Sequence, residues 1–184
     1  GTCLIFGCGD GHLAYEIAKQ TGDMKVLCVD PDSVQVDEAR ENLTAAGVYG
    51  DSVRVDEGTF ASLADSASSA DLVVIHRATR LRNETDAQRR ENWQRFRQAS
   101  AEEREVIIEQ MRTEYRQAFQ TAAAEAYRVL KPSGGVLFVE IAGGRRSLAG
   151  TADDLRDLLQ QSPFNPDADR IDSTDTWLKL TKGN

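Results

Sequence analysis

Short runs of consecutive apolar residues alternate along this chain with longer stretches in which apolar residues recur every three or four positions. Each run is bounded by turn-forming residues, which is typical of strands that are buried on both faces of a parallel sheet. Such strands, alternating with amphipathic helices, predict an α/β fold. We expect strands at Cys3–Phe6, Val26–Val29, Val53–Val55, Leu72–Ile75, Val136–Val139, Arg170–Asp172 and Thr176–Thr181. We expect helices at Leu13–Gln20, Ser33–Ala46 and Ala152–Gln160.

The interval between the fourth and fifth strands is too long for an ordinary connection between parallel strands. Capping boxes begin there at Thr85 and at Ser100, and each marks the start of a helix. We therefore expect a helical insertion over residues 83–130. Its two helices are predicted at Asp86–Gln98 and Ala101–Leu130.

The two inserted helices differ in the number of apolar side chains that can anchor them. The longer helix carries an apolar stripe at helical spacing, which we interpret as a packing face. The shorter helix has few apolar anchors beyond Trp93 and Phe96. Few anchors mean low local stability, so we expect this helix and the start of the longer one to form a mobile lid or a partner surface.

Composition places the chain among ordinary globular proteins. Its 184 residues are enough for one domain with its own core, and we expect a single domain over residues 1–184. No apolar run approaches the ~20 residues that a membrane-spanning helix needs. The 22 basic and 30 acidic residues give a net charge of −8, which opposes non-specific binding to nucleic acid.

The three cysteines, Cys3, Cys8 and Cys28, have no metal-ligand spacing, so we predict no metal site and interpret them as reduced, buried side chains. Their odd number fits a reducing compartment, and we expect a cytoplasmic protein. The chain opens at Gly1 in an expected strand and closes at Asn184 directly after another. We therefore expect a domain excised from a longer protein. A targeting signal that precedes Gly1 in that longer protein would place it in the cell envelope.

A glycine-rich loop, Gly7–Gly11, separates the first strand from the first helix. Glycines allow a sharp turn and a close approach of the backbone to a ligand, while the helix start offers free N–H groups. This arrangement predicts a nucleotide-like ligand at the carboxyl edge of the sheet. A dinucleotide fold places a third glycine where His12 stands, which disfavours a nicotinamide-dependent oxidoreductase. We interpret His12 as a helix-start residue.

An acidic residue, Asp30, ends the second strand. A carboxylate there can accept hydrogen bonds from both ribose hydroxyls. The alternative is a turn or capping residue before Pro31.

With this combination the chain resembles class I S-adenosyl-L-methionine-dependent methyltransferases. The likeness spans Gly1–Phe60 and resumes at Ala126–Glu140 and in the terminal strands, and it rests on the glycine loop, Asp30 and Ala126–Gly135. It implies a Rossmann-like, doubly wound, mostly parallel seven-stranded sheet with an antiparallel terminal hairpin. The stretch Gly7–Ala18 with Val29–Asp32 is most similar to bacterial domains that precede a quinoprotein-like β-propeller, which implies a fused C-terminal partner domain.

The resemblance also implies S-adenosyl-L-methionine as cofactor. The glycines would face its methionine and ribose parts, Asp30 would hold the ribose hydroxyls, and Pro31 and Asp32 would border the adenine. Thr59 and Phe60 would meet the adenine edge. The implied cofactor-binding residues are Gly7, Cys8, Gly9, Asp10, Gly11, Asp30, Pro31, Thr59 and Phe60.

Three positions depart from the family pattern. Ile5 stands where the family has an acid near the cofactor's amino group, a contact that Asp10 would have to supply. Thr59 stands where an aspartate commonly accepts the adenine amino group. The residues after the fourth strand, Ile75–Arg80, lack the Asn/Asp-Pro-Pro-aromatic motif of enzymes that methylate amino groups of nucleic acids. The last departure disfavours a nucleic-acid acceptor.

His76 follows the fourth strand and is the candidate catalytic base, since methyl transfer to a hydroxyl or ammonium group benefits from one. The alternative is a structural histidine at a strand end. Seven arginines lie nearby in the sequence. They form either a solvated helix face or a surface that binds an anionic acceptor or an acidic partner. They are Arg77, Arg80, Arg82, Arg89, Arg90, Arg95 and Arg97.

We therefore expect a methyltransferase acting on a small molecule or a protein. The departures at Ile5 and Thr59 support an alternative, a non-catalytic module of the same fold that senses the cofactor or serves as a scaffold.

Overall fold

The computed structural model describes residues 1–65, 69–76, 84–140, 152–160, 163–164, 169–174 and 177–183. The strands are β1 (Thr2–Phe6), β2 (Lys25–Asp30), β3 (Val53–Glu57), β4 (Leu72–Ile75), β5 (Val136–Glu140), β6 (Arg170–Ser173) and β7 (Trp177–Thr181). The helices are α1 (His12–Thr21), α2 (Ser33–Ala45), α3 (Phe60–Asp65), α4 (Asp86–Gln98), α5 (Ala101–Val129) and α6 (Ala152–Gln160).

The strands form one seven-stranded sheet in the order β3-β2-β1-β4-β5-β7-β6. The pairs among β1 to β5 are parallel, whereas β7 runs antiparallel to both β5 and β6. The predicted fold class, a doubly wound and mostly parallel sheet with an antiparallel terminal hairpin, is therefore confirmed. The chain first winds outward from β1 through β2 to β3 and then returns to the other side of β1 at β4.

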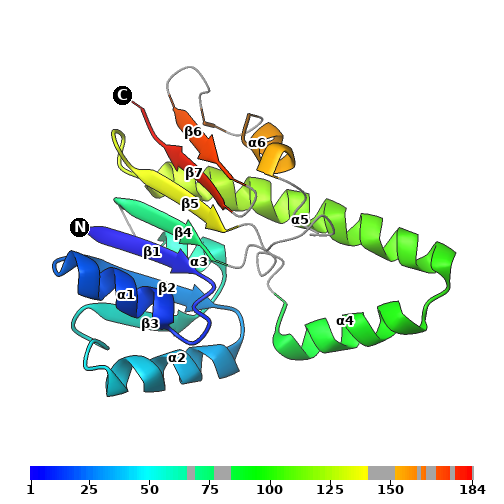
Figure 1. Cartoon of the computed structure of the whole chain (residues 1–184), viewed down its shortest axis with the longest axis horizontal. Helices are drawn as coiled ribbons and strands as arrows, with labels where there is room; N and C mark the ends of the chain where they lie inside the picture. Colours follow the sequence, from blue (N-terminus) through cyan, green and yellow to red (C-terminus); the bar gives the residue numbers. More distant parts are fainter. Residues whose placement is uncertain are drawn as a thin grey trace.

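Two hydrophobic cores cover the two faces of the sheet (Figure 1). On one face α1 and α2 pack through small or aliphatic side chains such as Ala14, Ala39 and Leu43. On the other face α3, α5 and α6 contribute larger side chains, among them Phe60, Phe119 and Leu155. Because side chains alternate along a strand, the short apolar runs of the sequence supply both cores at once.

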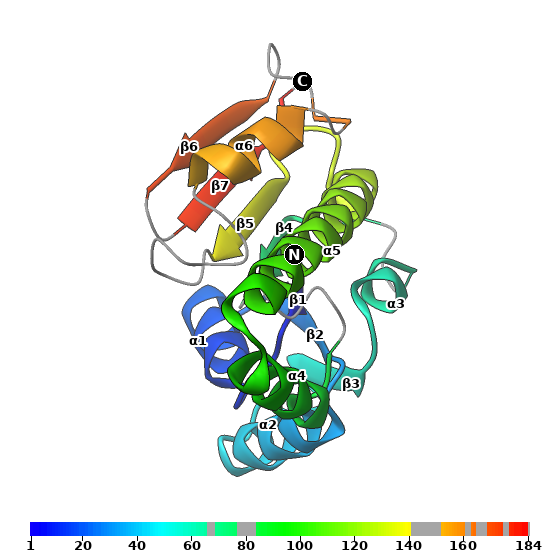
Figure 2. The same cartoon turned by 90° about the vertical axis from the view of Figure 1, so that its right-hand side faces the viewer.

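The inserted helices lie where the sequence predicts them. Both capping boxes are formed: Gln88 N donates to Thr85 Oγ1 (3.3 Å), and Glu103 N donates to Ser100 Oγ (3.2 Å). Figures 1 and 2 show that α4 and the first half of α5 project from the sheet as a helical hairpin. Whether this hairpin moves as a lid stays a prediction.

Helix α3 is the element that the sequence reasoning missed. Ser62 N donates to Thr59 Oγ1 (3.3 Å), and Ser62 Oγ donates to Thr59 O (2.8 Å), which closes the first turn locally. Six residues are too few to show helical periodicity.

No helix in the described ranges has the length and apolar character required to cross a membrane. Of the predicted basic cluster, Arg77, Arg80 and Arg82 lie outside the described residues.

Candidate functional site

The glycine loop follows β1 and has the tight geometry that its composition predicts. Gly7, Gly9 and Gly11 all have positive φ angles of 88°, 54° and 85°. Gly11 N donates to Cys8 O (3.0 Å), which closes a turn inside the loop. A Cβ atom on Gly7 would lie 2.2 Å from His76 O, so no side chain fits between the loop and the end of β4. Gly7 is therefore required both by its φ angle and by this close approach.

The loop lies at the point where the winding of the sheet reverses. β1 pairs with β2 on one side and with β4 on the other, and the chain leaves β1 toward β2. In open α/β sheets, ligands bind at the carboxyl ends of the strands, in the crevice at such a switch point. The topology thus places the loop in the ligand-binding position of the fold.

The loop leads directly into α1, which begins at His12 as predicted. Asp10 Oδ1 accepts a hydrogen bond from His12 N (3.1 Å), and Asp10 O accepts one from Asn42 Nδ2 (3.0 Å). Asp10 is exposed and acts here as a local cap that also ties the loop to α2. A contact between its carboxylate and a cofactor amino group stays a prediction. Gly11 itself brings no side-chain cap to the helix start.

Asp30 ends β2 next to the glycine loop and is fully buried, with 0% of its surface exposed. Its Oδ1 accepts a hydrogen bond from Asp32 N (3.0 Å), and its main-chain oxygen accepts one from Gly58 N (3.0 Å). Asp32 Oδ1 in turn accepts from Val34 N (3.1 Å) and caps α2. Asp30 therefore closes a turn before α2 and places a buried carboxylate at the carboxyl edge of the sheet, and its contact with a ribose stays a prediction.

The predicted adenine-edge residues have well-defined structural roles. The Thr59 hydroxyl accepts from Ser62 N at the start of α3. The Phe60 ring is buried and packs edge-on against Phe6, with ring centroids 5.7 Å apart. Pro31 is half-buried after Asp30, and Cys8 is buried within the loop. Their contacts with a cofactor stay predictions.

Two further cysteines, Cys3 in β1 and Cys28 in β2, lie in the same core as Cys8. Burial raises the pKa of the Cys3 thiol to about 12. Burial, followed by a hydrogen bond with Cys8, raises the pKa of Cys28 well above its ordinary value. Near neutral pH these thiols are protonated and behave as small apolar side chains.

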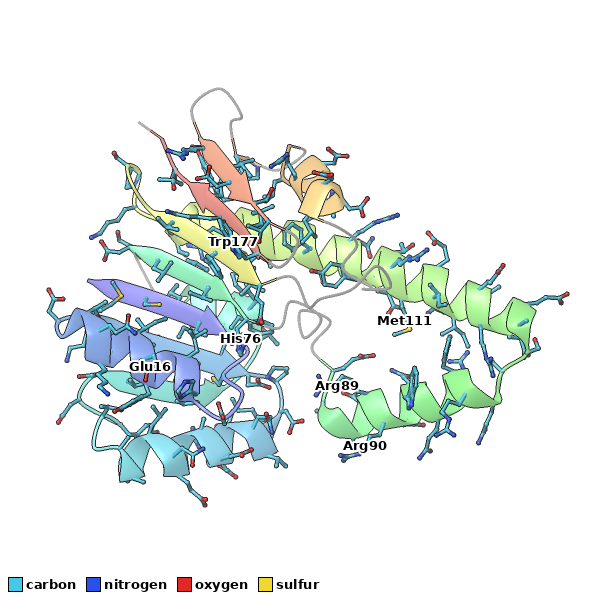
Figure 3. The ribbon with its side chains drawn as sticks, in the orientation of Figure 1. Glu16, His76, Arg89, Arg90, Met111 and Trp177 are labelled. Atoms are coloured by element: carbon cyan, nitrogen blue, oxygen red, sulfur yellow. The ribbon has the colours of Figure 1, made fainter. Side chains whose placement is uncertain are left out.

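His76 follows β4 and lies at this edge of the sheet (Figure 3), where it contacts residues that follow or end the two strands on either side of β4. Its Nδ1 lies 3.0 Å from Gly7 O, and its Nε2 lies 3.1 Å from Glu140 Oε2. A carbonyl and a carboxylate are both acceptors, so both contacts are satisfied together only when the ring carries both protons. In this arrangement His76 fastens the glycine loop to the end of β5.

Glu140 was not among the predicted site residues, although a signal for it exists. Ile75 pairs with Val139 in the register of β4 and β5, so the next residues, His76 and Glu140, lie side by side. Aligning the predicted parallel strands by their carboxyl ends would have brought the two together. The predicted strand ranges alone did not give that register.

The residues at this edge fit a nucleotide-like cofactor. The positive-φ glycines form a tight loop that carries few side chains, α1 begins directly behind it, and a buried carboxylate stands at the adjacent strand end. Within the described ranges, no group of three or more His, Cys, Asp or Glu residues is arranged to hold a metal ion.

A family model for the methyltransferase domain matches residues 3–99, just over half of the chain. The chain belongs to the methyltransferase domain family. The matched region runs from β1 to the end of α4 and so contains the glycine loop, Asp30 and His76.

Solved structures of methyltransferases share the fold of this domain at low sequence identity. A proposed O-methyltransferase from Nostoc punctiforme is 11% identical (TM-score 0.60), over 98% of this chain and 52% of its own. An O-methyltransferase family protein from Burkholderia thailandensis is 15% identical (TM-score 0.61), over 100% of this chain and 50% of its own. A proposed S-adenosyl-L-methionine-dependent methyltransferase from Methanococcus maripaludis is 17% identical (TM-score 0.62), over 100% and 78%. These likenesses show the fold.

The methyltransferase domain spans about half the length of the Nostoc and Burkholderia proteins. No curated protein sequence matches it significantly. A β-propeller following the domain stays a prediction.

Proposed function

We propose that this methyltransferase domain binds S-adenosyl-L-methionine at the glycine loop and transfers its methyl group to a small-molecule or protein acceptor. The observation that carries the proposal is the positive-φ glycine loop at the switch point of the sheet, beside the buried Asp30. The cofactor, when bound, supplies a methyl group on a positively charged sulfur, which is a strong electrophile. The chain then has to bind the cofactor and the acceptor, orient them for the transfer, and exclude water from the site.

Each part of the site has a task in this proposal. Gly7, Gly9 and Gly11 let the backbone approach the methionine and ribose parts of the cofactor. The Asp30 carboxylate accepts hydrogen bonds from the ribose hydroxyls, and its fixed turn through Asp32 N holds it in position. Pro31, Thr59 and Phe60 border the adenine, with Cys8 and Asp10 completing the loop.

His76 is proposed as the base for an acceptor that loses a proton. In the present contacts both ring nitrogens face acceptors, so the ring must lose its Nε2 proton to solvent and turn from Glu140 before Nε2 can accept a proton from the acceptor, while Nδ1–H still donates to Gly7 O. Glu140 then stabilises the charged ring. His76→Gln retains a donor toward Gly7 O and removes the base, so we expect it to lower turnover with little effect on cofactor affinity.

A second candidate is a non-catalytic module that binds the cofactor without turnover. It is favoured by Ile5, which is buried in the sheet where the resemblance expects an acid, and by the Thr59 hydroxyl, which already caps α3. Release of S-adenosyl-L-homocysteine above background with any member of a broad acceptor panel would exclude this alternative.

Calorimetric titration with S-adenosyl-L-methionine and S-adenosyl-L-homocysteine tests cofactor binding. Because Asp30 is fully buried, Asp30→Asn is the suitable variant: it keeps an oxygen for Asp32 N and removes the charge. We expect a loss of roughly 1.5–3 kcal/mol in cofactor binding.

Asp37→Asn, at an exposed position of α2, is the matched control and should leave cofactor affinity unchanged. An affinity of Asp30→Asn within twofold of the unaltered chain would make Asp30 a turn residue only. No binding of either ligand at submillimolar concentration would refute the proposed cofactor.

A further inference from the structure

The helical hairpin beside the sheet, formed by α4 and residues 101–114 of α5 and called the arm below, offers a surface that the proposed methyl transfer does not use. None of the described side chains of α4, nor any of residues 101–114, is buried. Trp93 is 59% exposed and Val106 is 68% exposed, and both are among the few large apolar side chains of the described residues that face solvent. The other two are Val34 and Tyr49, which lie outside the arm, so one projecting element carries half of them. Apolar side chains exposed on such an element are a candidate interaction surface.

Local contacts close the corner of the arm and orient the end of α4 relative to the start of α5. Arg104 Nε donates to Phe96 O (3.1 Å), and Arg104 Nη2 donates to Arg97 O (2.8 Å), which joins the end of α4 to the start of α5. The guanidinium also lies over the Phe96 ring, 5.6 Å from its centroid. Trp93 stacks on Phe96 with ring centroids 5.5 Å apart. Pre-organisation of this kind reduces the entropic cost of association.

One half of the surface is a basic stripe on α4, formed by Arg90, Trp93 and Arg97. The spacing of three and four residues places these side chains in one row along the helix. Figure 3 shows Arg90 pointing from α4 away from α5. All three residues are exposed, so the stripe presents an aromatic ring flanked by two positive charges.

The other half is an acidic hollow of about 640 Å³ between α4 and α5. Its lining includes three carboxylates and one guanidinium, those of Glu91, Glu102, Glu103 and Arg95, and the apolar side chains of Val106 and Ile107. The carboxylates and apolar side chains of the hollow are complementary to the stripe. The aromatic ring of the stripe can enter the hollow while the two flanking arginines contact the carboxylates.

We propose that the arm pairs with the arm of a second copy of this chain. Each copy carries both halves, so in a two-fold pair the stripe of one copy enters the hollow of the other, and the same contact forms twice. A two-fold interface requires such a self-complementary surface. The proposal concerns association only and is independent of the proposed cofactor site.

Charge reversal gives a test that separates this pairing from general loss of solubility or fold. One variant, Arg90→Glu with Arg97→Glu, reverses the stripe. A second, Glu91→Arg with Glu102→Arg, reverses the hollow and leaves Glu103 free to complete its capping box. Sedimentation over low micromolar to submillimolar concentrations should show a dimer for the unaltered chain and a dissociation constant at least about tenfold higher for each variant alone.

Mixing the two variants should restore the dimer. In the mixed dimer the reversed stripe of one variant faces the reversed hollow of the other, and the two unaltered surfaces face each other. Recovery in the mixture also shows that both variants are folded. The control variant, Arg112→Glu with Arg116→Glu, reverses two exposed charges of α5 that do not line the hollow and should associate like the unaltered chain.

Trp93→Ala should weaken the dimer without changing the charge. A chain that stays monomeric over the whole range would overturn the proposal and assign the arm to a different partner. Equal weakening by the control, or no recovery in the mixture, would overturn it as well.

Discussion

The two halves of α5 have the same secondary structure but opposite environments. Residues 101–114 have no buried side chain, whereas the second half buries Tyr115, Phe119, Ala122, Ala123, Ala126 and Val129. Both halves are rich in good helix formers, so local preferences alone support a continuous helix. The first half is held by its capping box and by exposed pairs such as Arg112 with Glu109. The second half is held by the core.

Helix formation and helix stability therefore have separate origins in α5. The capping box and the sequence-local pairs determine that residues 101–114 are helical, and each contributes about 1 kcal/mol or less. Packing against the sheet determines how much free energy the rest of α5 adds to the fold. The following predictions test that separation, beginning with the largest effect.

Phe119→Ala should lower the free energy of unfolding by about 3–5 kcal/mol, because it empties a fully buried position in the core of the sheet. Val106→Ala, on the exposed half of the same helix, should change it by less than about 0.5 kcal/mol. Urea unfolding followed by circular dichroism measures both. Similar losses for the two variants would show that the halves are not energetically distinct.

The body of the domain, meaning the sheet and the helices packed on it without the arm, should lose stability at alkaline pH through its buried thiols. The pKa of Cys3 is raised to about 12 by burial, against about 8.5 for an unfolded thiol. Between about pH 8.5 and 12 the unfolded chain ionises this thiol while the folded chain keeps it protonated. The contribution of Cys3 to the free energy of unfolding is therefore fully present below about pH 8.5 and falls by about 1.4 kcal/mol per pH unit as the pH rises toward 12. Urea unfolding between these limits should show a shallower decline for Cys3→Ala, which lacks the group. Parallel curves would contradict the prediction.

Ser100→Ala should loosen the arm and leave the body intact. It removes the hydroxyl that accepts from Glu103 N, which should cost the start of α5 about 1 kcal/mol of local stability. Hydrogen exchange should accelerate over residues 101–111 and stay unchanged over residues 115–129. Equal acceleration along the whole helix would mean that the two halves open together.

Glu109→Gln should have the smallest effect. Glu109 pairs with Arg112 (3.6 Å) and Arg116 (4.0 Å) on the exposed side of α5. Exposed pairs of this kind contribute less than about 0.5 kcal/mol and are screened by salt. The melting temperature measured at low and high salt should differ little from that of the unaltered chain, and a large loss would indicate that the arm depends on this pair.

The elements whose signals are local could be predicted from the amino-acid sequence. Parallel strands buried on both faces need apolar runs, a close-packed loop needs glycines, and helix starts need capping residues, so β1 to β5, the Gly7–Gly11 loop and both inserted helices were predicted. Asp30 was placed correctly at the end of β2, because its place at a strand end follows from the strand itself, and its contact with a cofactor stays a prediction.

The contacts between residues of different strands, and the exposure of each helical surface, depend on how the elements pack and could not be predicted in the same way. The contact of His76 with Gly7 O and Glu140 depends on the register of three strands, and helix α3 is too short to have a period. The exposure of Trp93 and Val106 depends on where α5 leaves the sheet. These features arise from contacts between residues far apart in the chain, and periodicity along the chain carries no information about such contacts.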